Sequence, residues 1–244
     1  MKKQDWWIII TYTIMQLSAF VGVPLFYKLG IGADENPNNS LFQAQAYWSI
    51  VSFTIALLLI LFFLRHDVKN KERHIQAAPA AESVAWAVLG VFLAFFVQTI
   101  AANIEVYIFN IRPGSENTQL IIDLIEVTPY LIIVTSIIGP ILEEIIFRKI
   151  IFGAIYRKTN FFIGALVSSL LFAIVHGEPE HILLYASMGF TFAFLYVKTK
   201  RILVPIFAHT MMNTIVVLIQ TIFRDDIENM IQQMEQIQTI IGGI

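Results

Sequence analysis

The chain has 244 residues, of which 57% are hydrophobic and 14% are charged, and its mean hydropathy is +0.71. Soluble domains usually carry about 25% charged residues, so this composition excludes an ordinary soluble domain and predicts a helical membrane protein. The net charge of −2 gives no indication of a nucleic-acid partner. The absence of cysteine excludes disulfides, cysteine metal sites and a cysteine nucleophile.

Seven apolar segments are candidates to cross a bilayer, which takes about 20 residues each. The first follows two lysines like a signal peptide, but its apolar run is too long for one, so we expect a retained anchor. We therefore predict an all-α, polytopic transmembrane helical bundle with about seven spans. In chain order the segments are Trp6–Lys28, Tyr47–Leu64, Ser83–Ile111, Thr128–Ile155, Phe161–His176, Ile182–Val197 and Ile202–Phe223.

The lysines and arginines predict how these segments are oriented. With a cytoplasmic N-terminus, only Lys28, Arg112 and Arg224 of the 16 basic residues lie on the outer side, and the other 13 lie in or beside cytoplasmic segments. Cytoplasmic loops of membrane proteins carry this excess of positive charge. The distribution predicts a multi-pass protein of the cell membrane with a cytoplasmic N-terminus and an outer C-terminus.

Two stretches are amphipathic rather than spanning. Apolar residues recur at helical spacing in the C-terminal tail, which predicts an interfacial helix on the bilayer, with a partner-binding helix as the alternative. The stretch Gln119–Val127 is similar, with Asp123 and Glu126 on its polar side. We divide the chain into residues 1–111, the N-terminal transmembrane helices; residues 112–223, a helical core with the polar groups described next; and residues 224–244, the amphipathic tail.

Ionisable side chains inside apolar segments are costly and usually have a function, although each alone can serve as a hydrogen-bonding contact between helices. Other polar residues have simpler explanations. We expect a structural or interfacial role for Glu105, no assigned role for Gln98, and solvated positions for His66, His74 and His181 in loops. The group that remains is Glu143, Glu144, Arg148, His176, His209 and Asn213.

Helical spacing separates the two glutamates. Glu144 lies four residues before Arg148, which favours an ion pair on one helix face. Glu143 is turned about 100° away and lacks that partner. An unpaired carboxylate in a poorly solvated site gains proton affinity, which suits a general base. His209 and Asn213 are also four apart and share a face.

Counting residues from the cytoplasmic turns predicts depth. At roughly 1.5 Å per residue, Glu143 and His176 both lie about 22–24 Å from the turn that joins their segments, while His209 lies only about 10 Å from its own. Pro140 removes a helical hydrogen bond and should kink the helix just before the glutamates. Phe172, four residues before His176, can pack against the histidine ring.

These residues resemble the three signature motifs of the CPBP family, the CAAX-protease and bacteriocin-processing membrane proteins also called Abi. The resemblance covers about Pro140 to Val217, a third of the chain, and all three motifs occur in the family's order. The motifs EExxxR, FxxxH and HxxxN/D correspond to Glu143-Glu144-Ile-Ile-Phe-Arg148, Phe172-Ala-Ile-Val-His176 and His209-Thr-Met-Met-Asn213.

The resemblance implies metal-independent intramembrane proteolysis, without a cofactor, of a membrane-embedded or membrane-associated peptide or protein. In that pattern Glu143 and His176 activate a water molecule, while His209 and Asn213 hold the developing oxyanion. The residues that support the site are Glu144, Arg148 and Phe172.

Two other functions are compatible with the sequence. Two histidines and a glutamate form a known catalytic zinc set, although the HExxH motif is absent, so a zinc-dependent membrane protease is one alternative. The other is a non-catalytic membrane regulator or bacteriocin-immunity protein. The intact motif set favours an enzyme over that second alternative.

Overall fold

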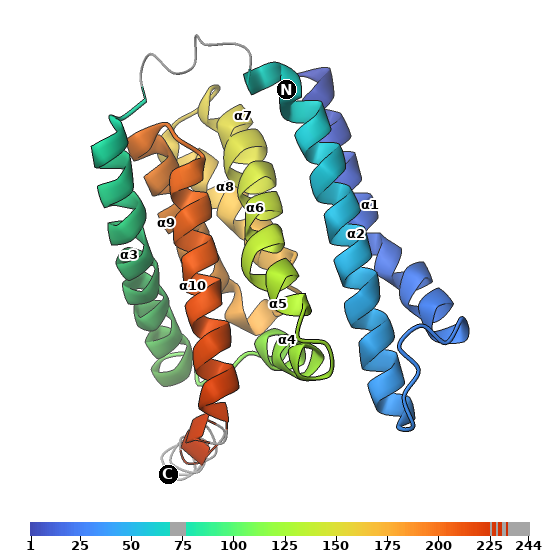
Figure 1. Cartoon of the computed structure of the whole chain (residues 1–244). Coiled ribbons are helices and arrows are strands. Elements are labelled where there is room, and N and C mark those ends of the chain that lie inside the picture. The colour runs from blue at the N-terminus through green and yellow to red at the C-terminus, as the bar shows by residue number, and fades with distance from the viewer. Residues whose placement is uncertain (69–76, 225, 228, 231–232, 234–244) are drawn as a thin grey trace.

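The computed structural model describes residues 1–68 and 77–224, together with residues 226, 227, 229, 230 and 233 of the tail. Every regular element in these ranges is a helix, as Figure 1 shows, so the predicted all-α class is confirmed. The predictions for the side chains of His66 and His74, and for most of the tail helix, lie outside the described residues.

Five helices in the described ranges are long and apolar enough to cross a membrane, which makes the chain a polytopic helical membrane protein. The segment predicted fifth is a shorter apolar helix, α8 (Phe161–Ile174), and the segment predicted fourth is divided among several short elements. The five long helices are α1 (Lys3–Lys28), α2 (Pro37–Val68), α3 (Ala80–Tyr107), α9 (Ile182–Thr199) and α10 (Leu203–Ile222).

The segment that carries the glutamates alternates between α-helical and π-helical turns. Pro140 has no backbone N–H, so the carbonyl of Ser136 cannot receive its usual α-helical hydrogen bond, and a π-helix ends directly before Gly139. Such π-turns often occur at functional sites. The elements are α5 (Leu131–Ile133), η2 (Val134–Ile138), α6 (Gly139–Glu143), η3 (Glu144–Phe152) and α7 (Gly153–Tyr156).

The helices are arranged around this irregular segment. In Figure 1 α1 and α2 stand side by side, and residues 131–156 lie between that pair and the group formed by α8, α9 and α10. Helix α3 packs against α9 and α10. The backbones of α8 and α9 approach closely at Gly189, where an added Cβ would lie 2.8 Å from Ser169 Oγ. Small residues permit this close approach in membrane bundles.

Large apolar side chains cover the outer faces of the bundle. Phe20 is 81% exposed, Phe92 69%, Phe162 71% and Leu203 71%. Rings so far exposed would be unfavourable in water, but they match the hydrocarbon of a bilayer. The outer surface thus agrees with the membrane location that the helix lengths indicate.

The predicted amphipathic stretch is helix α4 (Glu116–Val127), which buries Ile122 and Ile125. Ser115 caps its N-terminus by accepting a hydrogen bond from the backbone N–H of Thr118. At the other end, Asp123 and Glu126 both pair with Arg224, just beyond α10. Helix α4 is therefore capped at its N-terminus and joined by ion pairs to Arg224 near its C-terminus.

Candidate active site

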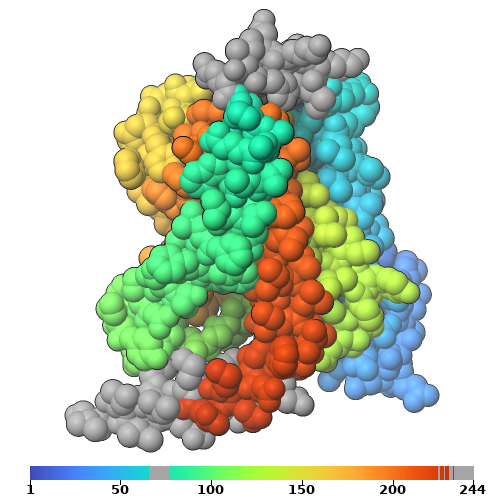
Figure 2. Space-filling model, turned by 60° about the vertical axis from the view of Figure 1, so that its left-hand side comes forward, coloured from blue at the N-terminus to red at the C-terminus, as the bar shows by residue number. Residues whose placement is uncertain are grey.

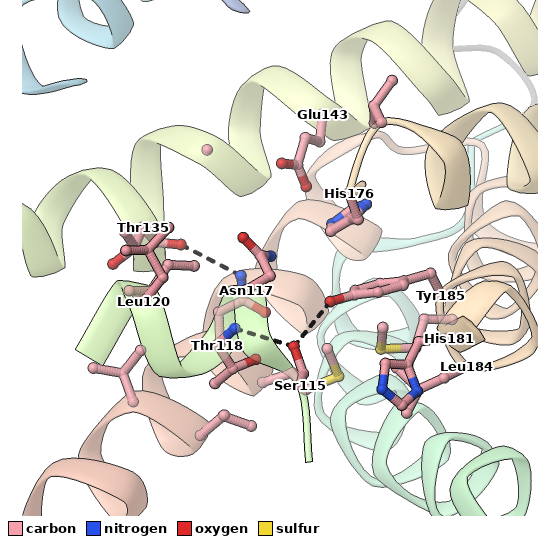
Figure 3. A pocket seen from close by; sticks show the side chains of 18 of the residues that line it. Ser115, Asn117, Thr118, Leu120, Thr135, Glu143, His176, His181, Leu184 and Tyr185 are labelled. Atoms are coloured by element: carbon pink, nitrogen blue, oxygen red, sulfur yellow. Dashed lines mark hydrogen bonds between the residues drawn. The ribbon is translucent and has the colours of Figure 1, made fainter. Parts of the chain in front are cut away.

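A cavity of about 640 Å³ lies among the helices, and it brings together the four predicted site residues of the three motifs. Glu143 comes from the end of α6, His176 from the turn after α8, and His209 and Asn213 from α10. Figure 3 shows the Glu143 carboxylate pointing toward the His176 ring inside the cavity. Segments far apart in the sequence thus present a carboxylate, two imidazoles and an amide to one space.

The cavity opens at the side of the molecule. Figure 2 shows the face where α3 and α10 lie next to each other, and the surface between them is hollowed toward the ends of these helices that are lowest in the view. Gln98 and Asn103 of α3 and Val216 and Gln220 of α10 line the cavity. Gln98, which had no assigned role from the sequence, is one of these lining residues.

The predicted ion pair between Glu144 and Arg148 is present and fully buried. Arg148 Nε lies 3.1 Å from Glu144 Oε2, and neither side chain is exposed. The guanidinium group lies over the ring of Phe172, 4.7 Å from its centroid, with the Phe192 ring 5.7 Å away. A cation over aromatic faces gains attraction in a poorly solvated environment. These contacts hold the second glutamate away from the cavity, which it does not line.

His209 contacts both glutamates. Its Nδ1 lies 3.0 Å from Glu144 Oε1, and its Nε2 lies 3.7 Å from Glu143 Oε2. The ring stacks on Phe192, with centroids 4.7 Å apart. Residue counting from separate turns had left His209 at a different depth from the glutamates, and these contacts place it beside them. The physical reason is that a residue count gives height above one turn only, and the two turns from which the counts began need not lie at the same depth.

The His176 ring is held by its own helix and by α9. Its Nδ1 lies 2.7 Å from the backbone carbonyl oxygen of Phe172, so this nitrogen carries the hydrogen and donates it. The predicted packing of Phe172 on the ring is confirmed, with centroids 4.5 Å apart. On α9, Tyr185 stacks against the ring at 4.1 Å. Because Nδ1 carries the hydrogen, Nε2 of the neutral His176 ring has the free lone pair.

Asn213 links α10 to the irregular segment. Its Nδ2 donates a hydrogen bond to the backbone carbonyl of Thr135, 3.3 Å away, within η2. Because an amide nitrogen has two hydrogens, one remains for the cavity that Asn213 lines. The predicted shared face of His209 and Asn213 is thus turned toward the site.

A second buried carboxylate has a structural explanation. Glu105, at the end of α3, accepts hydrogen bonds from the backbone N–H of Leu184 and from His181 Nδ1, both at 2.8 Å. These contacts support the structural or interfacial role predicted for Glu105, which also lines the cavity. The solvated position predicted for His181 was wrong, because the turn η4 (Pro179–His181) folds back onto α3 and buries the ring.

A polar network that the sequence did not predict lies beside His176. The buried carboxylate of Glu178 accepts hydrogen bonds from Tyr185 Oη at 2.5 Å, from Ser115 Oγ at 2.8 Å and from the backbone N–H of Asn117 at 2.9 Å. Burial raises the pKa of Glu178, but these three hydrogen bonds outweigh it and hold the pKa below its ordinary value. The one available signal was a glutamate two residues after His176.

The geometry of the acidic and histidine side chains bears on the possible zinc set. In residues 1–68 and 77–224, no group of three or more histidine, aspartate and glutamate side chains lies in an arrangement that could hold a metal ion. The close contacts in the site are instead pairwise, between His209 and each glutamate.

In this polytopic helical bundle, one glutamate, two histidines and an asparagine line a single cavity. Comparison with known proteins identifies the class as membrane proteases, which are hydrolases. Residues 126–215 match the family described as type II CAAX prenyl endopeptidase Rce1-like. The chain belongs to this Rce1-like (CPBP) family of CAAX endopeptidases, as its sequence motifs indicated. No solved structure matches the chain.

Two similar proteins cover almost the whole chain. The putative membrane peptidase YdiL of Bacillus subtilis (strain 168) is 52% identical over 245 residues, which span 100% of this chain and 99% of the relative. The membrane-embedded CAAX protease MroQ of Staphylococcus aureus (strain USA300) is 33% identical over 230 residues, 88% of this chain and 89% of the relative. The similarity therefore includes the N-terminal helices, for which the motifs gave no information.

Proposed function

We propose that the chain is a glutamate-type intramembrane endopeptidase that cleaves a membrane-embedded or membrane-associated peptide or protein without a metal ion. The observation that carries this proposal is the convergence of Glu143, His176, His209 and Asn213 on one cavity inside the bundle. The family supplies the reaction class, and the cavity supplies the groups that peptide hydrolysis needs.

Glu143 and His176 activate the attacking water. Both the carboxylate and the neutral His176 Nε2 accept hydrogen bonds, so one water molecule between them is held with its oxygen lone pair toward the substrate carbonyl. As the oxygen bonds to the carbonyl carbon, one water proton passes to Glu143. When the carbon–nitrogen bond breaks, Glu143 returns this proton to the leaving amine, so the enzyme ends in its starting state.

His209 and Asn213 stabilise the oxyanion. Because Nδ1 of His209 donates to Glu144, its Nε2 can donate only if the ring carries a second proton. That proton would balance the charges of Glu143 and Glu144 against Arg148 in a buried cluster, where net charge is costly. Asn213 contributes the hydrogen that Thr135 leaves free. Pre-placed donors of this kind stabilise developing negative charge.

The side opening supports a membrane substrate. A segment that lies within the bilayer can reach the cavity between α3 and α10 without crossing the polar surface. Amide side chains such as Gln98 and Gln220 then offer hydrogen bonds to an unwound peptide backbone, which lipid cannot satisfy.

The proposed arrangement in the cell membrane has seven membrane-embedded segments. The five long helices span the bilayer, α8 packs against α9 with Phe162 on the outer face, and residues 131–156 lie between the α1–α2 pair and α8, α9 and α10. The excess of lysine and arginine in the predicted inner segments supports a cytoplasmic N-terminus.

The proposal is tested by comparing membrane peptides, by mass spectrometry, in cells that produce the wild-type protein or the Glu143→Ala variant at equal levels. We expect peptides with a new terminus only in wild-type cells. Identical peptide sets in both cells would contradict proteolysis by this site. A peptide found in this way serves as the reporter substrate in the experiments below.

The oxyanion assignment is distinguished from a zinc site by Asn213→Ala and His209→Ala. Removal of one oxyanion donor costs roughly 10²–10³ in kcat, so we expect that loss for Asn213→Ala with KM nearly unchanged. Elemental analysis of purified wild type and His209→Ala accompanies the kinetics. Stoichiometric zinc in the wild type that disappears with activity in His209→Ala would overturn the oxyanion role.

A further inference from the structure

The His176 ring is held between two aromatic rings, and only one of them belongs to a sequence motif. Phe172 contacts one face at 4.5 Å, and Tyr185 stacks on the ring at 4.1 Å with 24° between the planes. Because of this near-parallel stacking, the Tyr185 ring occupies the space into which the imidazole would otherwise tilt. The direction of His176 Nε2 therefore depends on a residue outside the three motifs.

Tyr185 is itself fixed through its hydroxyl. This group donates to Glu178 Oε2 at 2.5 Å, and the same oxygen accepts from Ser115 Oγ at 2.8 Å. The second oxygen, Oε1, accepts from the backbone N–H of Asn117 at 2.9 Å. Hydrogen bonds to an ionised carboxylate are shorter and stronger than neutral ones. Figure 3 shows Tyr185 and Ser115 on the side of the cavity where the loop before α4 enters.

We propose that Tyr185 and Glu178 are positioning residues that hold the His176 ring in its catalytic direction. The proposal rests on the function proposed above, in which His176 Nε2 accepts a hydrogen bond from the attacking water. Neither Tyr185 nor Glu178 needs to touch the substrate, because stacking transmits the constraint. A shift of 1 Å in a reacting group can cost about 10²-fold in rate, so an unsupported His176 ring should lower kcat.

The principal alternative is that the network only attaches α4 to the bundle. In that case loss of the network lowers stability, but the His176 ring stays in place within the folded protein. The two explanations therefore differ in the state of His176, which can be observed directly. Nitrogen-15 labelling of histidine distinguishes a ring protonated on Nδ1 from one protonated on Nε2 without any substrate.

The experiment uses three variants and one control. Tyr185→Phe keeps the stacked ring but removes the link to Glu178, Tyr185→Leu removes the ring, and Glu178→Gln weakens the acceptor. The control is Tyr156→Phe, because Tyr156 stacks on Phe152 in a separate cluster. Each protein is compared with wild type by histidine NMR in detergent micelles, by thermal unfolding, and by kcat and KM on the reporter peptide.

We expect Tyr185→Leu to lower kcat by roughly 10- to 100-fold with KM nearly unchanged, and to shift the His176 signals toward a mixture of the two protonated nitrogens. Tyr185→Phe and Glu178→Gln should show the same changes to a smaller extent, and Tyr156→Phe none. Wild-type His176 signals in folded Tyr185→Leu would overturn the proposal, whatever its activity. Because the NMR needs no turnover, this result stays separate from any failure of the proposed proteolysis.

Discussion

Glu144 has two partners, and each takes one of its oxygens. Oε2 lies 3.1 Å from Arg148 Nε, and Oε1 lies 3.0 Å from His209 Nδ1. Glu143, one residue earlier, retains a side chain that is 17% exposed and lines the cavity. Adjacent carboxylates in one helical segment thus differ in environment, because one is fully paired inside the protein and the other faces the cavity.

This difference gives a prediction for two matched variants. Glu143→Gln should abolish turnover with little change in thermal unfolding, because the amide keeps the shape of the side chain but cannot accept a proton from water. Glu144→Gln should lose stability as well, since it leaves Arg148 without its buried partner, and breaking a buried pair typically costs about 3–5 kcal/mol. Reporter cleavage and thermal unfolding measure the two effects.

The matched pair also shows how the interpretation would fail. Full turnover in Glu143→Gln would show that Glu143 is not the general base. Equal losses of activity and of stability in the two variants would contradict the separate roles proposed for Glu143 and Glu144. Wild-type stability in Glu144→Gln would mean that the contact with Arg148 contributes little to the folded state.

Spacing in the sequence predicted the pairing within a helix but not the contact between helices. Glu144 and Arg148 lie four apart, so helical geometry alone brings them together. The contact of His209 with Glu144 depends on the position of α10 along the axis of the neighbouring irregular segment. Residue counts within each segment do not give this relative position. His181 was assigned to solvent because a loop in sequence does not show what it folds against.

At the scale of elements, the turn after α8 joins α4 to α9 through one carboxylate. Because Glu178 has a pKa below the ordinary value of 4.5, it is ionised through the neutral range. A depressed pKa contributes stability that is complete above the ordinary value and is lost as the pH falls through the lower, folded-state value. The attachment of α4 should therefore resist mild acid.

Hydrogen exchange at the Asn117 amide measures this attachment, since that N–H donates to Glu178. After correction for the intrinsic exchange rate, we expect constant protection from pH 8 to pH 5 and a loss only below 4.5. Glu178→Gln should lower protection at every pH. A loss of wild-type protection between pH 7 and pH 5 would show that another titrating group controls the contact.

Helices α3 and α10 form the side opening, and the natural absence of cysteine makes this opening measurable. Gln98 lines the cavity, so the substitution Gln98→Cys introduces a thiol there. The substitution Phe92→Cys in the same helix introduces a thiol on the outer face, where Phe92 is 69% exposed. Charged maleimides react with the thiolate, which forms in water and not in hydrocarbon. Water in the cavity should therefore make the two positions react differently.

In liposomes we expect Gln98→Cys to react roughly tenfold faster than Phe92→Cys with a membrane-impermeant maleimide, because thiolate formation needs water. Mass spectrometry of the intact protein gives the labelled fraction with time, and unfolding in denaturant gives the full labelling of each variant. Equal slow rates at both positions would mean that water does not reach the cavity from the opening.

The element boundaries show where the sequence was informative and where it was not. Mean hydropathy over long windows indicated α1, α2 and α3, because lipid-facing helices must be apolar over their whole length. The same signal could not reveal that residues 131–156 alternate between helix types, since π-turns depend on the packing around Pro140 as well as on its missing N–H. The fifth predicted segment, Phe161–His176, did correspond to a separate helix, α8, which is only 14 residues long.

At the scale of the whole molecule, the positions of the basic residues in the structure bear on how the bundle is oriented in the membrane. The turn at Arg157 and Lys158 and the turn at Lys200 and Arg201 lie at the end of the bundle opposite to α4, as Figure 1 shows for the ends of α7, α9 and α10. Positive residues near these turns favour the cytoplasmic side. The cavity, which α4 and the residues around His181 border, would then lie toward the outer half of the membrane.

The orientation is tested by fusing green fluorescent protein, which in bacteria becomes fluorescent only in the cytoplasm, to either end of the full chain. With seven membrane-embedded segments and an inner N-terminus, the fusion before Met1 should fluoresce and the fusion after Ile244 should not, because positive charge keeps the loops around Arg157 and Arg201 inside. Immunoblots of both fusions at full length provide the control for expression. Fluorescence at both ends would require an even number of crossings, in which case one segment, most readily the 14-residue α8, enters the bilayer without spanning it.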